Sequence, residues 1–156
     1  MLIGVISDTH GHLDPRALPA LQGAELILHA GDIGDEAIIS TLGMVAPVLA
    51  VRGNVDGGAL ARRYPAMQWL EREGVRIYMT HIGGRPHDLA RALPAEAELR
   101  PDVYIFGHSH TSLLETMGGV LFLNPGAAGR PRFGGGLSVA LLYVGAGRAA
   151  AKIVPL

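Results

Sequence analysis

The 156-residue chain contains no cysteine, which excludes disulfide bonds, thiolate nucleophiles and sulfur ligands for metals. It also lacks an excess of basic residues, because 13 Lys and Arg stand against 14 Asp and Glu and the formal net charge is −1. Proteins that track nucleic-acid backbones carry a basic field, so stable nucleic-acid binding is not expected. Any metal ion must be held by nitrogen and oxygen atoms.

Long apolar runs are missing as well. No stretch of about 18 or more apolar residues appears, so no membrane span is predicted. The first ten residues, MLIGVISDTH, contain neither a basic segment nor a long apolar core, and a signal peptide is not expected. We therefore expect a cytoplasmic protein. The length fits one domain over residues 1–156 that buries a substantial core.

Short runs rich in Val, Ile, Leu and Tyr recur along the chain. Each run is continuous rather than alternating, which is typical of strands covered on both faces. Helix-like segments separate the runs, and this alternation predicts a largely parallel sheet with right-handed crossovers. The strands are expected near 2–7, 25–30, 47–53, 75–80 and 102–107, and the helices near 14–22, 35–45, 57–63 and 86–99, the last interrupted at Pro94.

The pattern changes after residue 112, where residues 112–124 and 136–156 predict two hairpins with glycine-containing turns. We expect these hairpins to form a second, antiparallel sheet. Residues 66–80 predict a further hairpin that turns at Glu73 and Gly74. Two sheets packed together with helices outside give an α/β fold, a four-layer αββα sandwich of two mixed sheets. The Gly- and Pro-rich stretch 124–136 predicts a loop over a site.

Polar side chains suited to metal binding follow each of the five predicted strands. In α/β sheets, ligands bind beyond the carboxyl ends of the strands. Any one of these residues has a simpler explanation alone, such as a helix cap, a turn or a satisfied buried polar group. Seven of them at five successive strand ends are hard to explain by independent turns, and together they predict a metal centre. The seven are Asp8, His10, Asp32, Asn54, His81, His108 and His110.

These residues stand in an ordered series of motifs: DTH (8–10), GD with Asp35 three positions on (31–35), GNVD (53–56), TH (80–81), GHSH (107–110) and NPG (124–126). From residue 5 to about 132 the chain thereby resembles the calcineurin-like metallophosphoesterases, and specifically their small bacterial and archaeal phosphodiesterase branch. The resemblance implies two metal ions. It assigns Asp8, His10 and His110 to the first ion, Asn54, His81 and His108 to the second, and Asp32 to a bridge between them.

The ligand types agree with this resemblance. Imidazole and carboxylate without thiolate suit Mn²⁺, Fe²⁺, Co²⁺, Ni²⁺ or Zn²⁺, and four imidazoles argue against Ca²⁺ or Mg²⁺. Two dications would leave the site cationic despite the charges of Asp8 and Asp32, so that it attracts phosphoryl oxygens and acidifies water. Manganese is our first expectation for the metal.

We therefore expect a dinuclear phosphodiesterase that hydrolyses small phosphodiesters with good leaving groups through a metal-bridging hydroxide. A phosphomonoesterase is the alternative within the enzymes. From a different class, the resemblance also includes a subunit of a eukaryotic membrane-trafficking coat, so a weakly active protein-binding scaffold is the third hypothesis. The family also suggests a homodimer.

Weaker candidates surround the seven ligands. Asp35 and Asp56 follow the family pattern and either orient ligand histidines or cap helices. Loop arginines near the ligands are either substrate contacts that reach a phosphate oxygen or solvated side chains; they are Arg85, Arg130 and Arg132. Three further histidines complete the set: His29 is expected to be packed in an apolar stretch, and His12 and His87 lie in loops beside ligands.

The chain departs from many relatives at Val55. In their GNH motif the histidine after the asparagine is thought to protonate the leaving oxygen, whereas valine cannot donate a proton. The small phosphodiesterase branch often lacks this histidine, so Val55 supports membership in that branch. NPGA in place of NPGS and THIGG in place of the usual HG are further departures.

Overall fold

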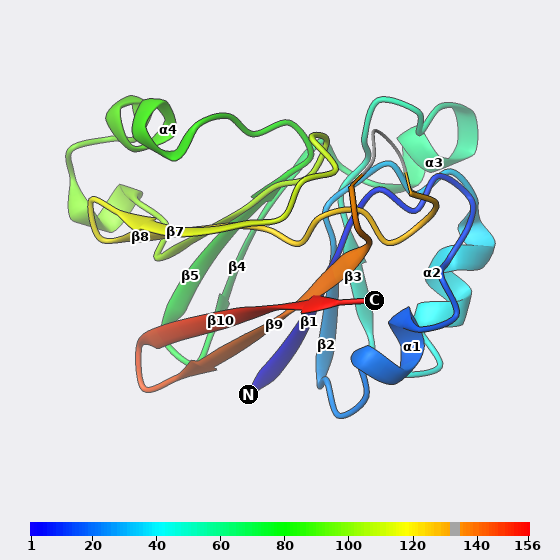
Figure 1. The fold of residues 1–156 in the computed structure, drawn as a ribbon. Coiled ribbons are helices and arrows are strands. Elements are labelled where there is room, and N and C mark those ends of the chain that lie inside the picture. Colours follow the sequence, from blue (N-terminus) through cyan, green and yellow to red (C-terminus); the bar gives the residue numbers. More distant parts are fainter. Residues whose placement is uncertain (132–134) are drawn as a thin grey trace.

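Two five-stranded sheets stack face to face in the computed structural model, which describes residues 1–131 and 135–156 (Figure 1). Helices α1 (Ala17–Ala20) and α2 (Glu36–Leu42) lie outside the first sheet, and α4 (Pro86–Ala92) lies outside the second. The layers therefore follow the predicted order of helix, sheet, sheet and helix. Helix α3 (Gly58–Arg63) lies beside α2 in this view.

The first sheet has the strand order β10-β9-β1-β2-β3. Strands β1 (Leu2–Ile6), β2 (Leu26–His29) and β3 (Val48–Ala50) run parallel to one another, as the alternation of strands and helices predicts. Strand β9 (Ser138–Gly145) is antiparallel to β1, and β10 (Arg148–Pro155) closes that edge.

The second sheet has the order β4-β5-β6-β8-β7. The hairpin predicted for residues 66–80 is present as β4 (Met67–Arg72) and β5 (Val75–Thr80). Strand β6 (Val103–Ile105) is parallel to both β5 and β8 (Val120–Asn124), and β7 (Leu113–Met117) pairs antiparallel with β8.

The expectation that the two late hairpins form one antiparallel sheet was wrong. The β7–β8 hairpin extends the second sheet beside β6, whereas the β9–β10 hairpin joins the first sheet beside β1. The reason is burial: residues 138–142 of β9 are all buried, which requires cover on both faces and a neighbour on each side. A position between β1 and β10 provides both.

The main core lies between the two sheets and is built from side chains such as Ile3, Val5, Ile77, Ile105 and Leu142, all fully buried. A second cluster joins the first sheet to α1 and α2, and a third joins the second sheet to α4 through aromatic rings of β6 and β8. Burial of these apolar surfaces on three levels is the main source of stability.

Local signals set the helix ends. Asp35 begins α2 as its N-cap and accepts a hydrogen bond of 2.8 Å from the Ala37 N–H. Pro86 stands in the first turn of α4, where its missing N–H costs nothing. The predicted interruption at Pro94 is confirmed, because α4 ends at Ala92 and only a short 3₁₀ turn, η1 (Ala97–Leu99), follows.

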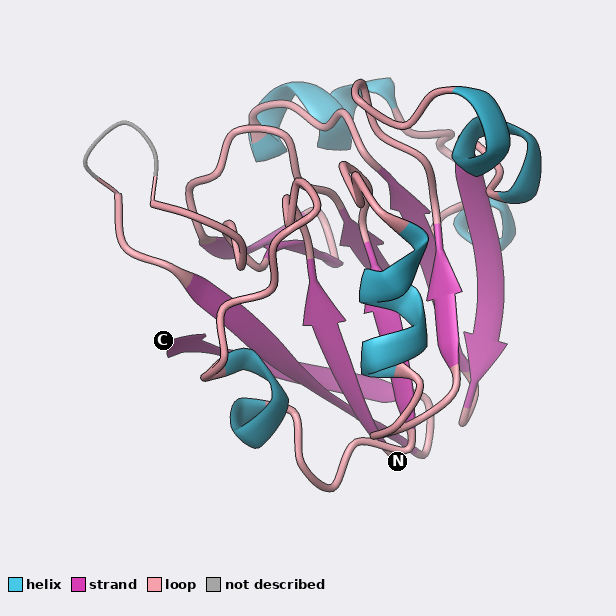
Figure 2. Cartoon of the chain, turned by 90° about the vertical axis from the view of Figure 1, so that its right-hand side faces the viewer, coloured by secondary structure: helices cyan, strands magenta, loops and turns pink. Residues whose placement is uncertain are grey.

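Strands β1, β2, β3, β5 and β6 end on the same side of the molecule, where the connecting loops gather (Figure 2). The predicted ligands therefore meet at one end of both sheets. None of the helices in the described part of the chain has the length and apolar character that a membrane crossing needs.

Candidate metal centre

The loops that carry the predicted ligands turn sharply where the strands end. The backbone φ angle is 55° at Asp8, 48° at His10 and 54° at Asp32. It is 69° at His108 and 59° at His110. This left-handed region is unfavourable for residues with a side chain, and such strain is concentrated at functional sites. Five of the seven predicted ligands thus depart from ordinary loop geometry.

One cluster joins the loop after β1 to the loop after β6. The Nε2 atom of His110 lies 3.3 Å from Oδ1 of Asp8, and the Nε2 atom of His10 lies 3.9 Å from the same oxygen. The two histidine Nε2 atoms are 3.2 Å apart. Three potential ligand atoms from distant parts of the sequence thus converge at one point.

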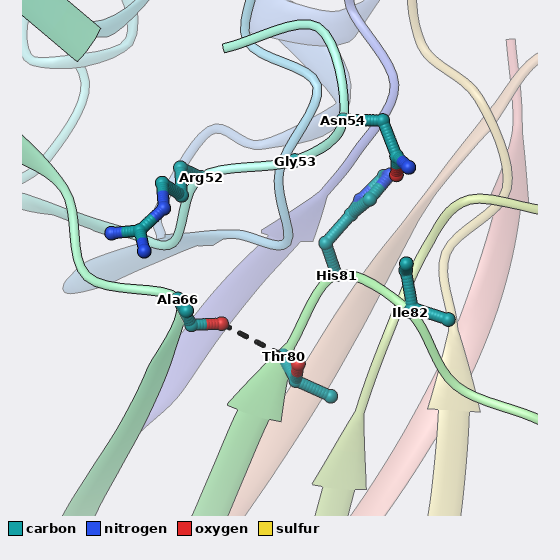
Figure 3. Close-up of a pocket in the computed structure, with 7 residues that line it drawn as sticks. All are labelled: Arg52, Gly53, Asn54, Ala66, Thr80, His81 and Ile82. Carbon is teal, nitrogen blue, oxygen red and sulfur yellow. Dashed lines mark hydrogen bonds between the residues drawn. The ribbon is translucent and has the colours of Figure 1, made fainter. Parts of the chain in front are cut away.

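A second cluster forms around Asp32. Its Oδ2 atom lies 3.3 Å from Nε2 of His81 and 3.5 Å from Nε2 of His10. The ring of His108 stands edge-on to that of His81, with centroids 5.2 Å apart. Asn54 lines a pocket together with His81 (Figure 3). Both Asn54 and His108 are exposed, so their donor atoms stand at the open side of the centre.

The buried donors fit a metal. Within the described chain, Oδ1 of Asp8 and Nε2 of His81 are buried and have no hydrogen-bond partner. Leaving such atoms unsatisfied costs roughly 1–3 kcal/mol each, more for a charged group. The ligand atoms of Asp8, His10 and His110 lie within 4.8 Å of one another, as do those of Asp8, Asp32 and His81. Cations held by these two groups of atoms would satisfy Oδ1 of Asp8 and Nε2 of His81, which the protein leaves without partners.

Hydrogen bonds to the backbone orient the ligands. Nδ1 of His81 lies 2.8 Å from the Ala30 carbonyl oxygen, which directs Nε2 into the centre when Nδ1 carries the proton. The backbone N–H of His108 donates to Oδ2 of Asp8 over 3.1 Å, and the N–H of Val55 donates to Oδ1 of Asp32 over 2.9 Å. Each carboxylate therefore has one oxygen held by the backbone while the other faces the histidines.

The two carboxylates differ in their electrostatics. Burial raises the pKa of Asp8 above its usual value. Burial also raises the pKa of Asp32, but the close contact with His81 and a hydrogen bond from the Val55 N–H outweigh it and bring that pKa to about 2. Burial lowers the pKa of His81, but the close contact with the Asp32 carboxylate and the hydrogen bond to the Ala30 carbonyl outweigh it and raise that pKa above its ordinary value.

Two glycines permit the close approach of the loops. A Cβ atom at Gly107 would collide with the Ser7 hydroxyl and lie 2.8 Å from Oδ2 of Asp8. A Cβ atom at Gly53 would collide with the carboxylate and backbone of Asp32. The glycines of the GHSH and GNVD motifs are thus needed because a side chain would collide with the neighbouring loop, not because their backbone angles exclude other residues.

Asp35 and Asp56 serve the backbone. Asp35 is exposed and caps α2, one of the two roles expected for it. Asp56 is buried, and Gly57 rather than Asp56 is the N-cap of α3. Its carboxylate accepts hydrogen bonds of 3.1, 2.8 and 2.7 Å from the N–H groups of Ile33, Gly34 and Gly53. It therefore joins the loop after β2, which carries Asp32, to the loop after β3.

His29 is packed in the core, as expected, and burial lowers its pKa to about 4. It links two ligand loops. Its Nδ1 accepts from the Gly31 N–H over 3.2 Å, which leaves Nε2 to donate to the Thr9 hydroxyl oxygen over 3.0 Å. Thr9 in turn donates to the Ile33 carbonyl over 3.0 Å. Neutral His29 thus holds together the segments that flank Asp8, His10 and Asp32.

Asn124 is a supporting residue to which the sequence analysis assigned no role. Its Nδ2 donates to the Gly107 carbonyl over 2.9 Å and to the Ser109 hydroxyl over 3.0 Å, and its Oδ1 accepts from the Gly126 N–H over 2.9 Å. It is fully buried. The NPG motif therefore holds the turn between His108 and His110. A polar residue ending an apolar strand was the signal in the sequence.

The remaining candidates lie around the rim. Arg85 and Arg130 are exposed, and Arg85 lines a pocket of about 370 Å³ that also includes His108. Arg132 lies outside the described residues. His12 is exposed, and His87 stands on α4, 3.3 Å from an oxygen of Asp88.

The exposed apolar side chains of Val55 and Ile82 follow the predicted ligands Asn54 and His81. They are 50% and 56% exposed, respectively. Apolar side chains next to metal ligands are suited to contact the carbon parts of a substrate rather than its charge.

A candidate metal centre at one end of a two-sheet α/β sandwich defines the class of this protein, and comparison with known proteins identifies its family. The calcineurin-like phosphoesterase superfamily domain matches residues 1–147, and the chain belongs to this family. A probable metallophosphoesterase of Methanothermobacter thermautotrophicus is 36% identical over 142 residues, covering 85% of this chain and 80% of the relative.

Two further similarities concern activity and fold. Phosphodiesterase MJ0936 of Methanocaldococcus jannaschii is 29% identical, covering 81% of this chain and 83% of the relative. Vps29 of Entamoeba histolytica, solved in complex with Zn²⁺, has a TM-score of 0.78 at 22% identity and covers 99% of both chains, which shows the shared fold. The chain is a phosphoric ester hydrolase with a divalent-metal site.

Proposed function

We propose that the protein is a dinuclear metal-dependent phosphodiesterase. The observation that carries the proposal is the position of Asp32: its Oδ2 atom lies 3.5 Å from His10 of one ligand set and 3.3 Å from His81 of the other. A carboxylate between two sets of imidazoles is suited to bridge two ions. The first ion would be held by Asp8, His10 and His110 and the second by Asn54, His81 and His108, with Asp32 shared.

The chemistry of the donors favours a transition metal. Imidazole nitrogens and carboxylate oxygens bind first-row transition metals well. We propose Mn²⁺ as the metal, with Fe²⁺, Ni²⁺, Co²⁺ and Zn²⁺ as alternatives. When bound, two such ions would supply positive charge for the phosphoryl oxygens and would acidify an attacking water.

The protein's own contribution is orientation. The Ala30 carbonyl fixes the His81 ring, and the backbone N–H groups of His108 and Val55 each hold one carboxylate oxygen. Hydrogen bonds of this kind in metal sites keep ligands in place and raise their basicity. The open side, where Asn54 and His108 are exposed, is the side from which a phosphate ester can enter.

A diester fits the surroundings better than a monoester. A monoester carries two negative charges and benefits more than a diester from extra cations. In the described chain, Arg52 and Arg85 are the only arginine or lysine side chains that line the two pockets beside the predicted ligands. Exposed Val55 and Ile82 offer contacts to ester arms instead. The similarity to a phosphodiesterase supports the same choice.

The scaffold hypothesis rests on the fold shared with Vps29 alone. It gives no reason for the unpartnered buried atoms of Asp8 and His81 or for five ligands in a left-handed backbone. We therefore place it behind hydrolysis.

The deciding experiment combines metal analysis with two substrates. Purified protein loaded with Mn²⁺ should contain two ions per chain and should hydrolyse bis(4-nitrophenyl) phosphate with a higher kcat/KM than 4-nitrophenyl phosphate. Removal of the metal with a chelator should abolish both activities, and Mn²⁺ should restore them. A monoesterase kcat/KM more than about tenfold above the diesterase value would favour the monoesterase alternative, and full turnover without metal would exclude the proposal.

A further inference from the structure

A pocket beside the metal centre has a cationic side chain at its far side. It has a volume of about 230 Å³ and is lined by Arg52, Gly53, Asn54, Ala66, Thr80, His81 and Ile82. Figure 3 shows Arg52 on one side of this pocket and His81 with Asn54 on the other. The pocket thus lies between Arg52 and two proposed metal ligands.

The Arg52 guanidinium is held in place by the backbone. Its Nη1 atom donates to the carbonyl of Tyr64 over 3.1 Å and to that of Ala61 over 3.4 Å, at the end of α3. Both bonds come from one nitrogen, and within the described residues Nε and Nη2 of Arg52 can still donate to a ligand. Because the side chain is already fixed, an anion bound there would lose less free energy to ordering it.

The charge of Arg52 is not balanced by a carboxylate. Within residues 1–131 and 135–156, no ion pair joins Arg52 to Asp or Glu, and none of the side chains lining the pocket is acidic. The carboxylate of Glu36 next to α3 is occupied by other partners: it lies 3.1 Å from Nη1 of Arg63 and accepts the Tyr64 hydroxyl over 2.8 Å. An arginine without a counterion in the wall of a pocket is suited to a ligand anion.

The pocket is open to solvent, and its volume of about 230 Å³ leaves room for one arm of a phosphodiester beside Asn54 and His81. Thr80 and Asn54 supply polar groups along the wall, and Ile82 supplies an apolar one.

We infer that Arg52 selects phosphodiesters in which one ester arm ends in an anionic group, such as a carboxylate. This inference rests on the proposed phosphodiesterase function and specifies its substrate class. With the phosphodiester at the metal centre, the arm would extend past His81 and place its terminal charge at Arg52.

The test uses matched substrates that differ in one charge. Three 4-nitrophenyl phosphodiesters carry a 2-carboxyethyl arm, its amide, or a plain ethyl arm. We expect the native enzyme to prefer the carboxylate over the amide by about five- to tenfold in kcat/KM, as for a partly exposed charge-assisted hydrogen bond. Arg52→Gln should bring this ratio to about one, and Arg52→Lys should give an intermediate value.

Arg63→Gln is the matched control, because it removes an arginine of α3, the helix that Arg52 contacts, and Arg63 does not line the pocket. The carboxylate-to-amide ratio of this variant should equal that of the native enzyme. A binding measurement separates recognition from chemistry: the methylphosphonate monoesters of the same arms lack the nitrophenyl leaving group, and calorimetry should show the same preference.

The outcomes are distinct. Hydrolysis of all three substrates with a native ratio near one, or a preference that persists in Arg52→Gln, overturns the inference while the phosphodiesterase proposal stands. Absence of metal-dependent hydrolysis of any diester means that the proposed function itself has failed. If Arg52→Gln does not fold because α3 loses its contacts, the native ratio and Arg52→Lys still decide.

Discussion

Oδ2 of Asp32 lies 3.3 Å from Nε2 of His81, and this contact joins the loop after β2 in the first sheet to the loop after β5 in the second. Since β2 and β5 belong to different sheets, the metal centre stands where the two sheets meet. The carboxylate is held from the other side by the Val55 N–H. A change at Asp32 should therefore affect the whole centre, whereas a change at the exposed Asn54 should affect one side of it.

The first prediction compares these two residues. Asp32→Ala should reduce bound Mn²⁺ from two ions per chain to less than one, because both ions lose a shared ligand. Asn54→Ala should retain one ion and lose most of the other. Elemental analysis after equilibration at fixed Mn²⁺ measures this directly. Loss of the same single ion in both variants would contradict the bridging role of Asp32.

The second prediction concerns His29, which touches no substrate and acts by positioning. His29→Phe leaves the Gly31 N–H and the Thr9 hydroxyl without their partner. We expect Mn²⁺ affinity, measured by calorimetry, to fall by about tenfold or more, as for other residues that support metal ligands. His29→Gln keeps a donor for Thr9 and should recover part of the loss. Equal thermal destabilisation in both variants with unchanged affinity would indicate a purely structural role.

The third prediction turns on Val55, which cannot protonate a leaving oxygen. A positioned general acid contributes about 10²–10⁴ in rate, and its effect is largest when the leaving group is a strong base. Across aryl and alkyl diesters, the native rate should therefore fall steeply as leaving-group pKa rises. Val55→His should make this dependence shallower, with the largest gain for alkyl esters. If chemistry is rate-limiting and the native dependence is flat, another residue donates the proton, and His12→Ala and His87→Ala identify it.

The fourth prediction concerns stability and pH. Hydrogen bonds from Arg76 lower the pKa of Asp102, whose carboxylate accepts from Nε, Nη2 and the backbone N–H of Arg76 over 3.1, 3.0 and 2.8 Å. Because the folded-state pKa is depressed, the contribution to stability is present above the unfolded value of about 3.8 and is lost as pH falls through the folded value.

Asp102→Asn should therefore destabilise the protein by about 1 kcal/mol at pH 7, a value reduced for solvent screening at this partly exposed pair. The difference from the native protein should shrink as pH falls below 4. Urea unfolding at pH 7 and at pH 3 measures it, with Asp88→Asn on the exposed face of α4 as a control that should have little effect at either pH. A difference that does not change with pH would show that the carboxylate charge is not involved.

Much of the architecture could be predicted from local signals. Continuous apolar runs located the parallel strands, Pro94 marked the end of α4, and Glu73 with Gly74 marked the β4–β5 turn. Which sheet the β7–β8 and β9–β10 hairpins join could not be predicted in this way, because their pattern of apolar residues is compatible with either sheet. Only the burial of β9 beside β1 separated the two possibilities.

The site shows the same division. The types and order of the seven donors follow from the sequence, since polar residues at successive strand ends of an α/β sheet gather on one side. Their pairing does not. The 3.2 Å contact between His10 and His110, which are 100 positions apart, exists only because the two sheets pack against each other and because Gly107 lets the loop after β6 approach Ser7 and Asp8. The charge of Arg52 is visible in the sequence, but its place across a pocket from His81 is not. That place depends on hydrogen bonds to the carbonyls at the end of α3 and on the strand ends that meet at the pocket. Contacts of this kind join residues far apart in the sequence, so only the tertiary structure could decide them.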